Sequence, residues 1–332
     1  IKYLVMKKIW GTSFSLIGDL IMSLPQLNYF KNKYKDIYLY FVIHKKISYC
    51  APIFFNHPLI DKIHISGEWS TFNQSDYIIA SKCDVITTKL DHRNKKVLDR
   101  EHLFEKDWYN YKSCIDENAL MSGINDLDDY LTSDEKIPKL YKWFDVGYDI
   151  DQKKGAYTYN KIEAKKLNFQ LSKSLSIWPF AGYGRSKNRN PDEKWWRNFI
   201  EKIIKEKIHV YHFGYIKEPN LSDNNEYYHK HTDLDFFSQI KISLGTKFTI
   251  GTDSGSMWVL SAYSHPTLTL LTNWYENHHK NFFAALPPNK NGDVIFKENG
   301  FSSLTFEEVY EKCLHKGVSK VTKFDDLKNF FS

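Results

Sequence analysis

The segment "GTDSGSMWVLSAYSHPTLTLL" (251–271) decides the fold class. It joins a turn of small residues to a short apolar helix and then to a second apolar run. The strand-like run "KFTI" (247–250) leads directly into it. A strand that passes through a tight turn into a helix and on to another strand is the repeating unit of parallel α/β sheets. We therefore predict an α/β protein.

The same alternation forms two series, one in each half of the chain. Strand-like runs in the first half are 2–10, 36–43, 60–66 and 83–88, with helical patterns at 18–34, 48–58 and 100–123. Those in the second half are 174–180, 209–214, 247–253 and 267–272, with helical patterns at 191–207, 233–243, 254–264, 304–317 and 324–331. The polar stretch 145–160 shows little periodicity, which indicates a linker and a hinge.

We predict two doubly wound Rossmann-like domains, 1–150 and 151–332, that face each other across a cleft. A chain of 332 residues fits two domains, and 42% hydrophobic residues can build both cores. The net charge of +6 suits an anionic ligand but does not by itself indicate nucleic acid. Ligands of open parallel sheets bind beyond the carboxyl ends of the strands, where the turn at 251–255 falls.

That turn is a candidate anion site, because the first amides of a helix lack partners inside the helix and carry partial positive charge. The competing interpretation is that Asp253 or Ser254 is an ordinary N-cap. The loop "AGYGRSKNRNP" (181–191) favours the anion, since glycines such as Gly182 allow close approach beside the cations Lys187 and Arg189. A solvated basic loop remains the alternative there.

In the first half, "TSFSLIGDL" (12–20) places Gly18 and Asp19 at a helix start directly after a strand. Asp19 is either an acid that complements the helix dipole or a general base that accepts a hydroxyl proton. Ser15 in the preceding turn would orient it.

Four segments in order resemble the heptosyltransferase family, glycosyltransferase family 9, whose members have the two-domain GT-B fold. They are "GTSFSLIGDLIMSLPQLNYFKNKYKDIYLYFVI" (11–43), "FFNHPLIDKIHI" (54–65), "WPFAGYGRSKNRNPDEKWWRNFI" (178–200) and "FTIGTDSGSMWVLSAYSHPTLTLL" (248–271). The resemblance implies an inverting, metal-independent transfer of a heptose or other hexose-like sugar from a nucleotide-diphosphate donor to an acceptor hydroxyl. It also implies an N-terminal acceptor domain and a C-terminal donor domain.

The resemblance carries over to individual residues. Asp19 matches the family's acceptor base. The other matches on the acceptor side are Ser15, Gly18, and His92 and Arg93 of a basic segment. A solvated charged surface explains that basic segment equally well. Matches on the donor side are Gly182, Lys187, Arg189, Glu218, Thr252, Asp253, Ser254 and Gly255, with Glu218 near the donor ribose. We expect the Asp253 carboxylate to turn from the phosphates toward backbone or another neutral donor, because like charges repel.

Two departures from the family pattern leave the donor open. Trp258 stands where a His usually follows, and the family's Lys-x-Trp-Pro is replaced by "KNRNP". ADP-heptose is therefore not assumed.

The expected partners are a nucleotide sugar and a glycan or glycolipid acceptor, with or without phosphate, in lipopolysaccharide-type synthesis. No cofactor, metal or stable nucleic-acid partner is expected: the adjacent His278 and His279 point apart and lack ligand spacing. With no signal-like start, we expect a cytoplasmic protein, either free or at the inner face of the membrane. The alternatives are an epimerase or hydrolase of nucleotide sugars on the same fold, and a non-catalytic or nucleic-acid-binding module.

Overall fold

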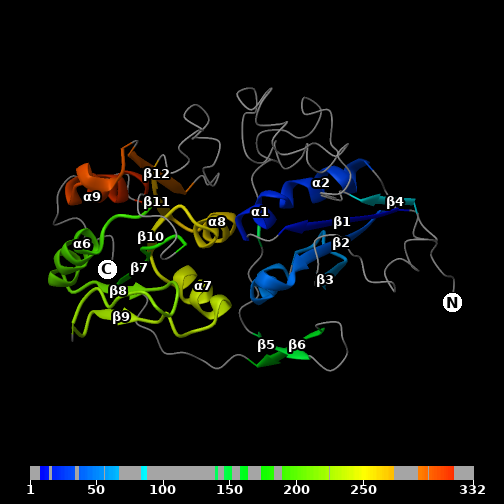
Figure 1. Cartoon of the computed structure of the whole chain (residues 1–332), viewed down its shortest axis with the longest axis horizontal. Helices are drawn as coiled ribbons and strands as arrows, with labels where there is room; N and C mark the ends of the chain where they lie inside the picture. The colour runs from blue at the N-terminus through cyan, green and yellow to red at the C-terminus, as the bar shows by residue number, and fades with distance from the viewer. Residues whose placement is uncertain are drawn as a thin grey trace. The chain divides into compact units, whose positions relative to one another are not determined.

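Figure 1 shows the computed structural model, in which the chain divides into two compact units. Unit 1 is formed largely by Ile1–Lys165 and unit 2 by the residues that follow. The structure describes residues 8–14, 17–33, 37–55, 57–66, 84–87, 139–140, 146–151, 158–163, 173–182, 189–223, 225–272, 291–297 and 299–317. The boundary after residue 150 and the hinge at 145–160 stay predictions.

Unit 1 contains a parallel sheet with strand order β3-β2-β1-β4. Its elements are β1 (Lys8–Phe14), α1 (Ile17–Met22), α2 (Leu24–Lys33), β2 (Ile37–His44), the 3-10 helix η1 (Lys45–Phe54), β3 (Lys62–Ser66) and β4 (Asp84–Thr87). The helical pattern predicted at 18–34 is confirmed as two helices separated by Ser23, with Pro25 in the first turn of α2. A proline is tolerated there because first-turn amides have no intrahelical partner.

Two expectations for unit 1 were wrong. The first strand was predicted to end at residue 10, but β1 continues through "GTSF", paired with β2 as far as Phe14 and Ile43, and Thr and Phe are good strand formers. The stretch 145–160 was predicted to be irregular, yet it holds β5 (Val146–Asp151) and β6 (Thr158–Glu163), which pair antiparallel. Val146, Tyr148 and Ile150 alternate with polar residues, which is a strand signal. The helix predicted at 100–123 lies outside the described residues.

Unit 2 is a parallel sheet of six strands in the order β12-β11-β10-β7-β8-β9. Its strands are β7 (Ser174–Trp178), β8 (His209–His212), β9 (Tyr228–Lys230), β10 (Phe248–Thr252), β11 (Thr267–Thr272) and β12 (Gly292–Lys297). The chain starts in the middle with β7, runs outward through β8 and β9, and crosses to the other side with β10. This is the strand order of the Rossmann fold, and its direction reverses between β7 and β10. The sequence missed β9 and β12.

Helices cover both faces of this sheet (Figure 1). They are α6 (Glu193–Lys205), α7 (Phe236–Gly245), α8 (Gly255–Ala262), the short 3-10 helix η5 (Phe301–Ser303) and α9 (Phe306–Gly317). The side chains of α6 and α9 share one core with Leu175, Ile177 and Val210. Every residue of β7, β10 and β11 is buried, as expected for central strands of a covered parallel sheet. Within the described residues, no helix has the length and hydropathy needed to cross a membrane.

The start of α6 differs slightly from the prediction. Pro191 was expected in the first helical turn, but the N-cap is Asp192, which accepts a hydrogen bond from the Trp195 amide at 2.6 Å. The proline therefore precedes the cap. The buried face of α6 carries apolar residues at helical spacing: Trp196, Phe199, Ile200, Ile203 and Ile204.

A ladder of imidazole rings runs along the β8–β9 edge of unit 2. Nδ1 of His209 and Nε2 of His229 are 2.8 Å apart, and the ring of His229 stacks on that of His231, with centroids 6.3 Å apart. Tyr211 stacks on His229 at 4.8 Å. Burial is the main cause that lowers the pKa of all three histidines below their ordinary value of 6.5. Lys173 and the neighbouring rings add to the lowering, whereas Glu226 and Asp233 oppose it. The rings are therefore neutral in the folded state at pH 7.

We predict that acid weakens unit 2 through this ladder. As the pH falls below 6.5, the unfolded chain takes up protons that the folded rings resist, so the free energy of unfolding falls. The total effect between pH 7.5 and 5.5 should be small, because solvent screens these half-buried rings. Urea unfolding midpoints at the two pH values measure it. The double variant His209→Gln/His229→Gln should show a smaller pH dependence, and an unchanged dependence would contradict the prediction.

Candidate functional site

The turn between β10 and α8 lies at the point where the strand order of unit 2 reverses. Thr252 is fully buried, the Asp253 amide donates to the Leu270 carbonyl at 3.0 Å, and α8 begins at Gly255. Ser254 occupies the N-cap position, but among the described residues its side chain makes no capping hydrogen bond. The simple N-cap interpretation of Ser254 is therefore not supported.

Close packing explains the glycine that precedes this turn. A Cβ atom at Gly251 would lie 2.6 Å from the Met257 sulfur and 3.0 Å from the Trp178 carbonyl oxygen. A methionine side chain can move, but the carbonyl belongs to the paired strand β7. Gly251 thus lets α8 start directly against the β7–β10 pair.

Arg189 binds this turn from the loop that follows β7. Its Nε and Nη2 donate to the backbone oxygen of Asp253 at 3.2 and 2.8 Å, and Nη2 lies 3.4 Å from the Asp253 carboxylate. Both side chains are largely buried, with 22% and 10% exposed. We expected backbone or another neutral donor for the Asp253 carboxylate, and the structure places a cation, the Arg189 guanidinium, beside it, which the sequence did not predict. The guanidinium offsets a buried charge that would otherwise oppose an anion at α8.

The loop after β7 is fastened at its base. Asn190 accepts from the Ala181 amide at 2.7 Å and donates to the Ala181 carbonyl at 3.3 Å. Thr252 donates to the Pro179 carbonyl at 3.4 Å, which ties the ends of β7 and β10 together. Gly182 has φ 58°, a left-handed conformation that glycine adopts easily, as its place in the loop suggested. Lys187 lies outside the described residues.

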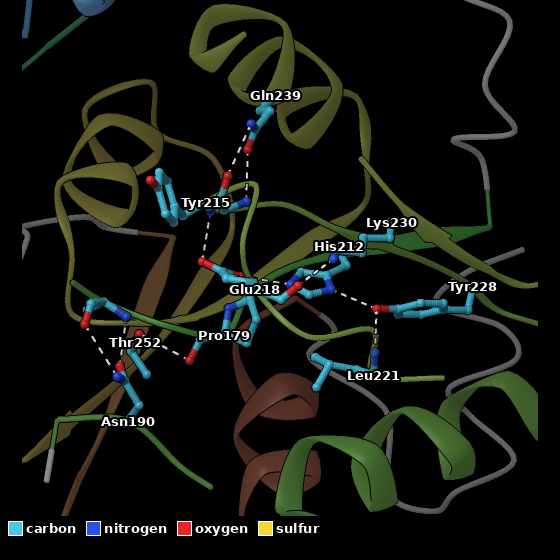
Figure 2. Close-up of polar contacts among 12 residues, drawn as sticks. Pro179, Asn190, His212, Tyr215, Glu218, Leu221, Tyr228, Lys230, Gln239 and Thr252 are labelled. Atoms are coloured by element: carbon cyan, nitrogen blue, oxygen red, sulfur yellow. Dashed lines mark hydrogen bonds and ion pairs between the residues drawn. The ribbon is translucent and has the colours of Figure 1, made fainter. Parts of the chain in front are cut away.

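Glu218 lies in a buried polar chain at the end of β8 (Figure 2). Its two carboxylate oxygens bind the Tyr215 amide at 2.8 Å and His212 Nε2 at 2.9 Å. His212 Nδ1 is 2.7 Å from the Tyr228 hydroxyl, which itself accepts from the Leu221 amide at 3.0 Å. A carboxylate oxygen accepts, so His212 donates to Glu218 through Nε2, and Nδ1 of the neutral ring then accepts from the Tyr228 hydroxyl.

Burial holds this chain in one protonation state. It is the main cause that lowers the pKa of His212, against the opposing effect of Glu218, and it raises the pKa of the Tyr228 hydroxyl. The Lys230 ammonium also donates to the Glu218 carbonyl. Because the Glu218 carboxylate is buried and bonded on both oxygens, it fixes the 215–221 loop. Its contact with a donor ribose stays a proposal.

Two of the predicted residues of unit 1, Gly18 and Asp19, follow the strand at which the strand order of that sheet reverses. Gly18 and Asp19 lie in α1, which follows β1, and the strand order of unit 1 reverses between β1 and β4. The prediction of a helix start directly after the first strand is thereby confirmed. Ser15, His92 and Arg93 lie outside the described residues. In the described parts of both units, no three His, Cys, Asp or Glu side chains gather closely enough to hold a metal ion.

The sequence missed several residues that shape the loops of unit 2 around this turn and the end of β8: Asn190, His212, Tyr228 and Gln239. A signal for one of them was present. The strand-like run "HVYHFG" places His212 among apolar neighbours, which indicates that it is buried. A buried histidine needs polar partners. The partners Tyr228 and Gln239 come from distant segments and have no local signal.

The fold has well-defined counterparts among solved structures. No family model and no curated protein matches the sequence. ADP-heptose lipopolysaccharide heptosyltransferase II of E. coli is 13% identical with a TM-score of 0.61, over 92% of this chain and 97% of that one. The glycosyltransferase family 9 protein of Veillonella parvula is 12% identical with a TM-score of 0.58, over 93% and 96%. E. coli heptosyltransferase WaaC, solved with ADP, is 12% identical with a TM-score of 0.55, over 92% and 98%.

These likenesses extend over nearly the full length of each protein, so they concern the whole chain rather than one Rossmann-like unit. The predicted resemblance to the heptosyltransferases is confirmed at the level of the fold. The chain has a Rossmann-like α/β fold similar to that of glycosyltransferase family 9 structures.

Proposed function

We propose that this protein is a glycosyltransferase that moves a sugar from a nucleotide-diphosphate donor to an acceptor hydroxyl. The observation that carries the proposal is the Arg189-bound turn before α8, at the point where the strand order of unit 2 reverses. Ligands of doubly wound sheets bind at such points, and helix amides there attract anions. The likeness to heptosyltransferase structures supports the same conclusion.

The proposed reaction is a single displacement that inverts the anomeric carbon and uses no metal. Asp19 removes the proton from the acceptor hydroxyl, whose oxygen forms the new bond as the bond to the diphosphate breaks. The leaving diphosphate keeps the electron pair and is stabilised by amides at Ser254–Gly255 and by Lys187. In this proposal, residues 1–150 hold the acceptor and 151–332 hold the donor, in a GT-B arrangement.

The transferred sugar is a heptose or a hexose-like sugar, and the acceptor is a glycan or glycolipid of lipopolysaccharide type. Trp258 is buried within α8, so it offers no exposed polar contact to the donor. The nucleotide is therefore left to experiment. We also propose that the protein works in the cytoplasm, free or at the inner face of the membrane.

A thermal-shift screen tests the donor class. ADP, UDP and GDP are compared with their sugars, because a ligand that binds only the folded state raises the midpoint by mass action. We expect one nucleotide series to stabilise the protein, and no stabilisation by any of them would contradict the proposal. Conversion of the donor without an acceptor would instead favour the epimerase or hydrolase. Strong salt-dependent binding of DNA or RNA would favour the nucleic-acid alternative.

The first prediction from this proposal concerns Asp19. Asp19→Asn keeps the size of the side chain but removes the base, so the transfer rate should fall about 10²–10⁴-fold while donor affinity stays nearly constant. The rate is measured with the donor found in the screen and a truncated lipopolysaccharide core as acceptor, and the affinity by calorimetry. Asp61→Asn, which breaks a pair with Lys31 at the surface of unit 1, is the control. Full transfer activity in Asp19→Asn would end the assignment of the base.

The second prediction concerns the route by which Arg189 acts on the diphosphate. Arg189→Met leaves a buried Asp253 charge without its guanidinium, and it should weaken ADP or UDP binding by about 1.5–3 kcal/mol. In an Asp253→Asn background that charge is absent, so the same change should cost less, by at least about 0.5 kcal/mol. Calorimetry on the four proteins of this cycle measures the coupling.

The control for this cycle is Lys187→Ala. If Lys187 contacts the phosphates directly, its replacement should lower nucleotide affinity equally in the wild type and in Asp253→Asn, since it does not act through Asp253. Equal losses for Arg189→Met in both backgrounds would show that Arg189 contacts the phosphates itself, as the sequence suggested.

A further inference from the structure

Two large apolar side chains stand out in solvent at the end of β8. Tyr215 is 54% exposed and Ile216 is 59% exposed. Among the described residues, the other large hydrophobic side chain of comparable exposure is Tyr49 of unit 1, at 45%. Scattered exposed hydrophobic residues are common, but two adjacent ones on a single loop call for a physical reason.

The loop that carries them is held from below at several points. Gln239 of α7 accepts from the Gly214 amide at 2.9 Å and donates to the Gly214 carbonyl at 3.3 Å and to the Leu234 carbonyl at 2.7 Å. Gly214 has φ 148°, and a Cβ atom there would overlap the Glu218 carboxylate. The Glu218 carboxylate in turn receives the Tyr215 amide at 2.8 Å. Backbone held in a rare conformation by surrounding contacts is characteristic of functional loops.

Figure 2 shows Tyr215 at one end of this hydrogen-bonded chain and Tyr228 at the other. The polar groups of the chain are therefore satisfied inside the protein, and the Tyr215 and Ile216 side chains are left to face outward. Buried support combined with an exposed apolar tip gives a rigid surface, so a ligand would meet it without an ordering cost.

The tip also lies at the correct edge of the sheet. It follows β8, which pairs with β7, and β7 pairs with β10, whose end leads into the Arg189-bound turn. With about 4.8 Å between neighbouring strands, the ends of β8 and β10 are roughly 10 Å apart. All three strands are parallel, so these ends face the same way. A ribose bridges such a gap when a phosphate sits beyond β10 and the base beyond β8.

We propose that Tyr215 and Ile216 hold the nucleobase of the donor. This inference deepens the proposed function and rests on it, since the phosphates must bind at the α8 turn. A phenol ring and an aliphatic side chain suit the flat face of a base, whereas a sugar rich in hydroxyls needs polar partners. The exposed tip itself is uncharged, because the Glu218 carboxylate of the loop is buried and bonded below it, so the surface contributes affinity for nucleosides in general rather than for phosphate.

The test compares three probes on the full chain by calorimetry: ADP, UDP and inorganic pyrophosphate. Tyr215→Ala should weaken ADP or UDP binding about 5- to 100-fold, the share of one stacked base, and leave pyrophosphate affinity unchanged. Tyr215→Phe keeps the aromatic face and should bind as the wild type does. Tyr49→Ala, which removes a similarly exposed tyrosine from unit 1, is the matched control and should also bind as the wild type does.

Three results would overturn the inference. If the wild type binds a nucleoside diphosphate and Tyr215→Ala binds it equally well, the base lies elsewhere while the proposed function stands. If Tyr215→Ala loses pyrophosphate affinity as much as nucleotide affinity, the residue acts on the phosphates. If the wild type binds none of the three probes, the proposed function fails and the inference fails with it.

Discussion

Unit 2 depends on the parallel pairing of β7 with β10. The register Leu175–Phe248 to Trp178–Gly251 joins strands that are more than seventy residues apart in the chain. Buried hydroxyl groups fix the pair: the Ser176 Oγ lies 2.5 Å from the Thr249 Oγ1, which is also 2.9 Å from the His265 Nε2. Once these strands lie side by side, the turn after β10 and the loop after β7 must leave the sheet at neighbouring points. The Arg189 contact then follows from topology rather than from local sequence.

The charges near α8 explain how a site for an anion can contain an acid. Asp253 is buried, and an isolated carboxylate there would repel a diphosphate and would be costly to desolvate. The guanidinium of Arg189 offsets that charge inside the protein, so Asp253 opposes an anion at the α8 amides less than an isolated carboxylate would. The modest net charge of +6 is thus a poor guide to this site. The relevant quantity is the arrangement of two charges over a few ångströms.

Much of the fold could be predicted from the sequence because its central strands are short apolar runs next to helical patterns. The seven-residue strand β1 and the hairpin β5–β6 were misjudged where glycine or polar residues interrupted the signal. For the candidate site, positions at strand ends such as Asp253 and Gly182 were identifiable from turn chemistry. The partner of Asp253 and the buried chain from Tyr228 to Glu218 were not, because hydrogen bonds between segments far apart in sequence leave no periodic trace. The chemistry of a position could be inferred, but not the neighbour that it would meet.

The double hydrogen bond between Asn190 and Ala181 has an evolutionary consequence. It closes the base of the loop after β7 independently of the residues in between, so the strand before it and α6 after it are anchored whatever the loop contains. Substitutions between the two anchor residues should then disturb the core little. Because the base of the loop stays closed, the scaffold keeps its stability while the loop changes.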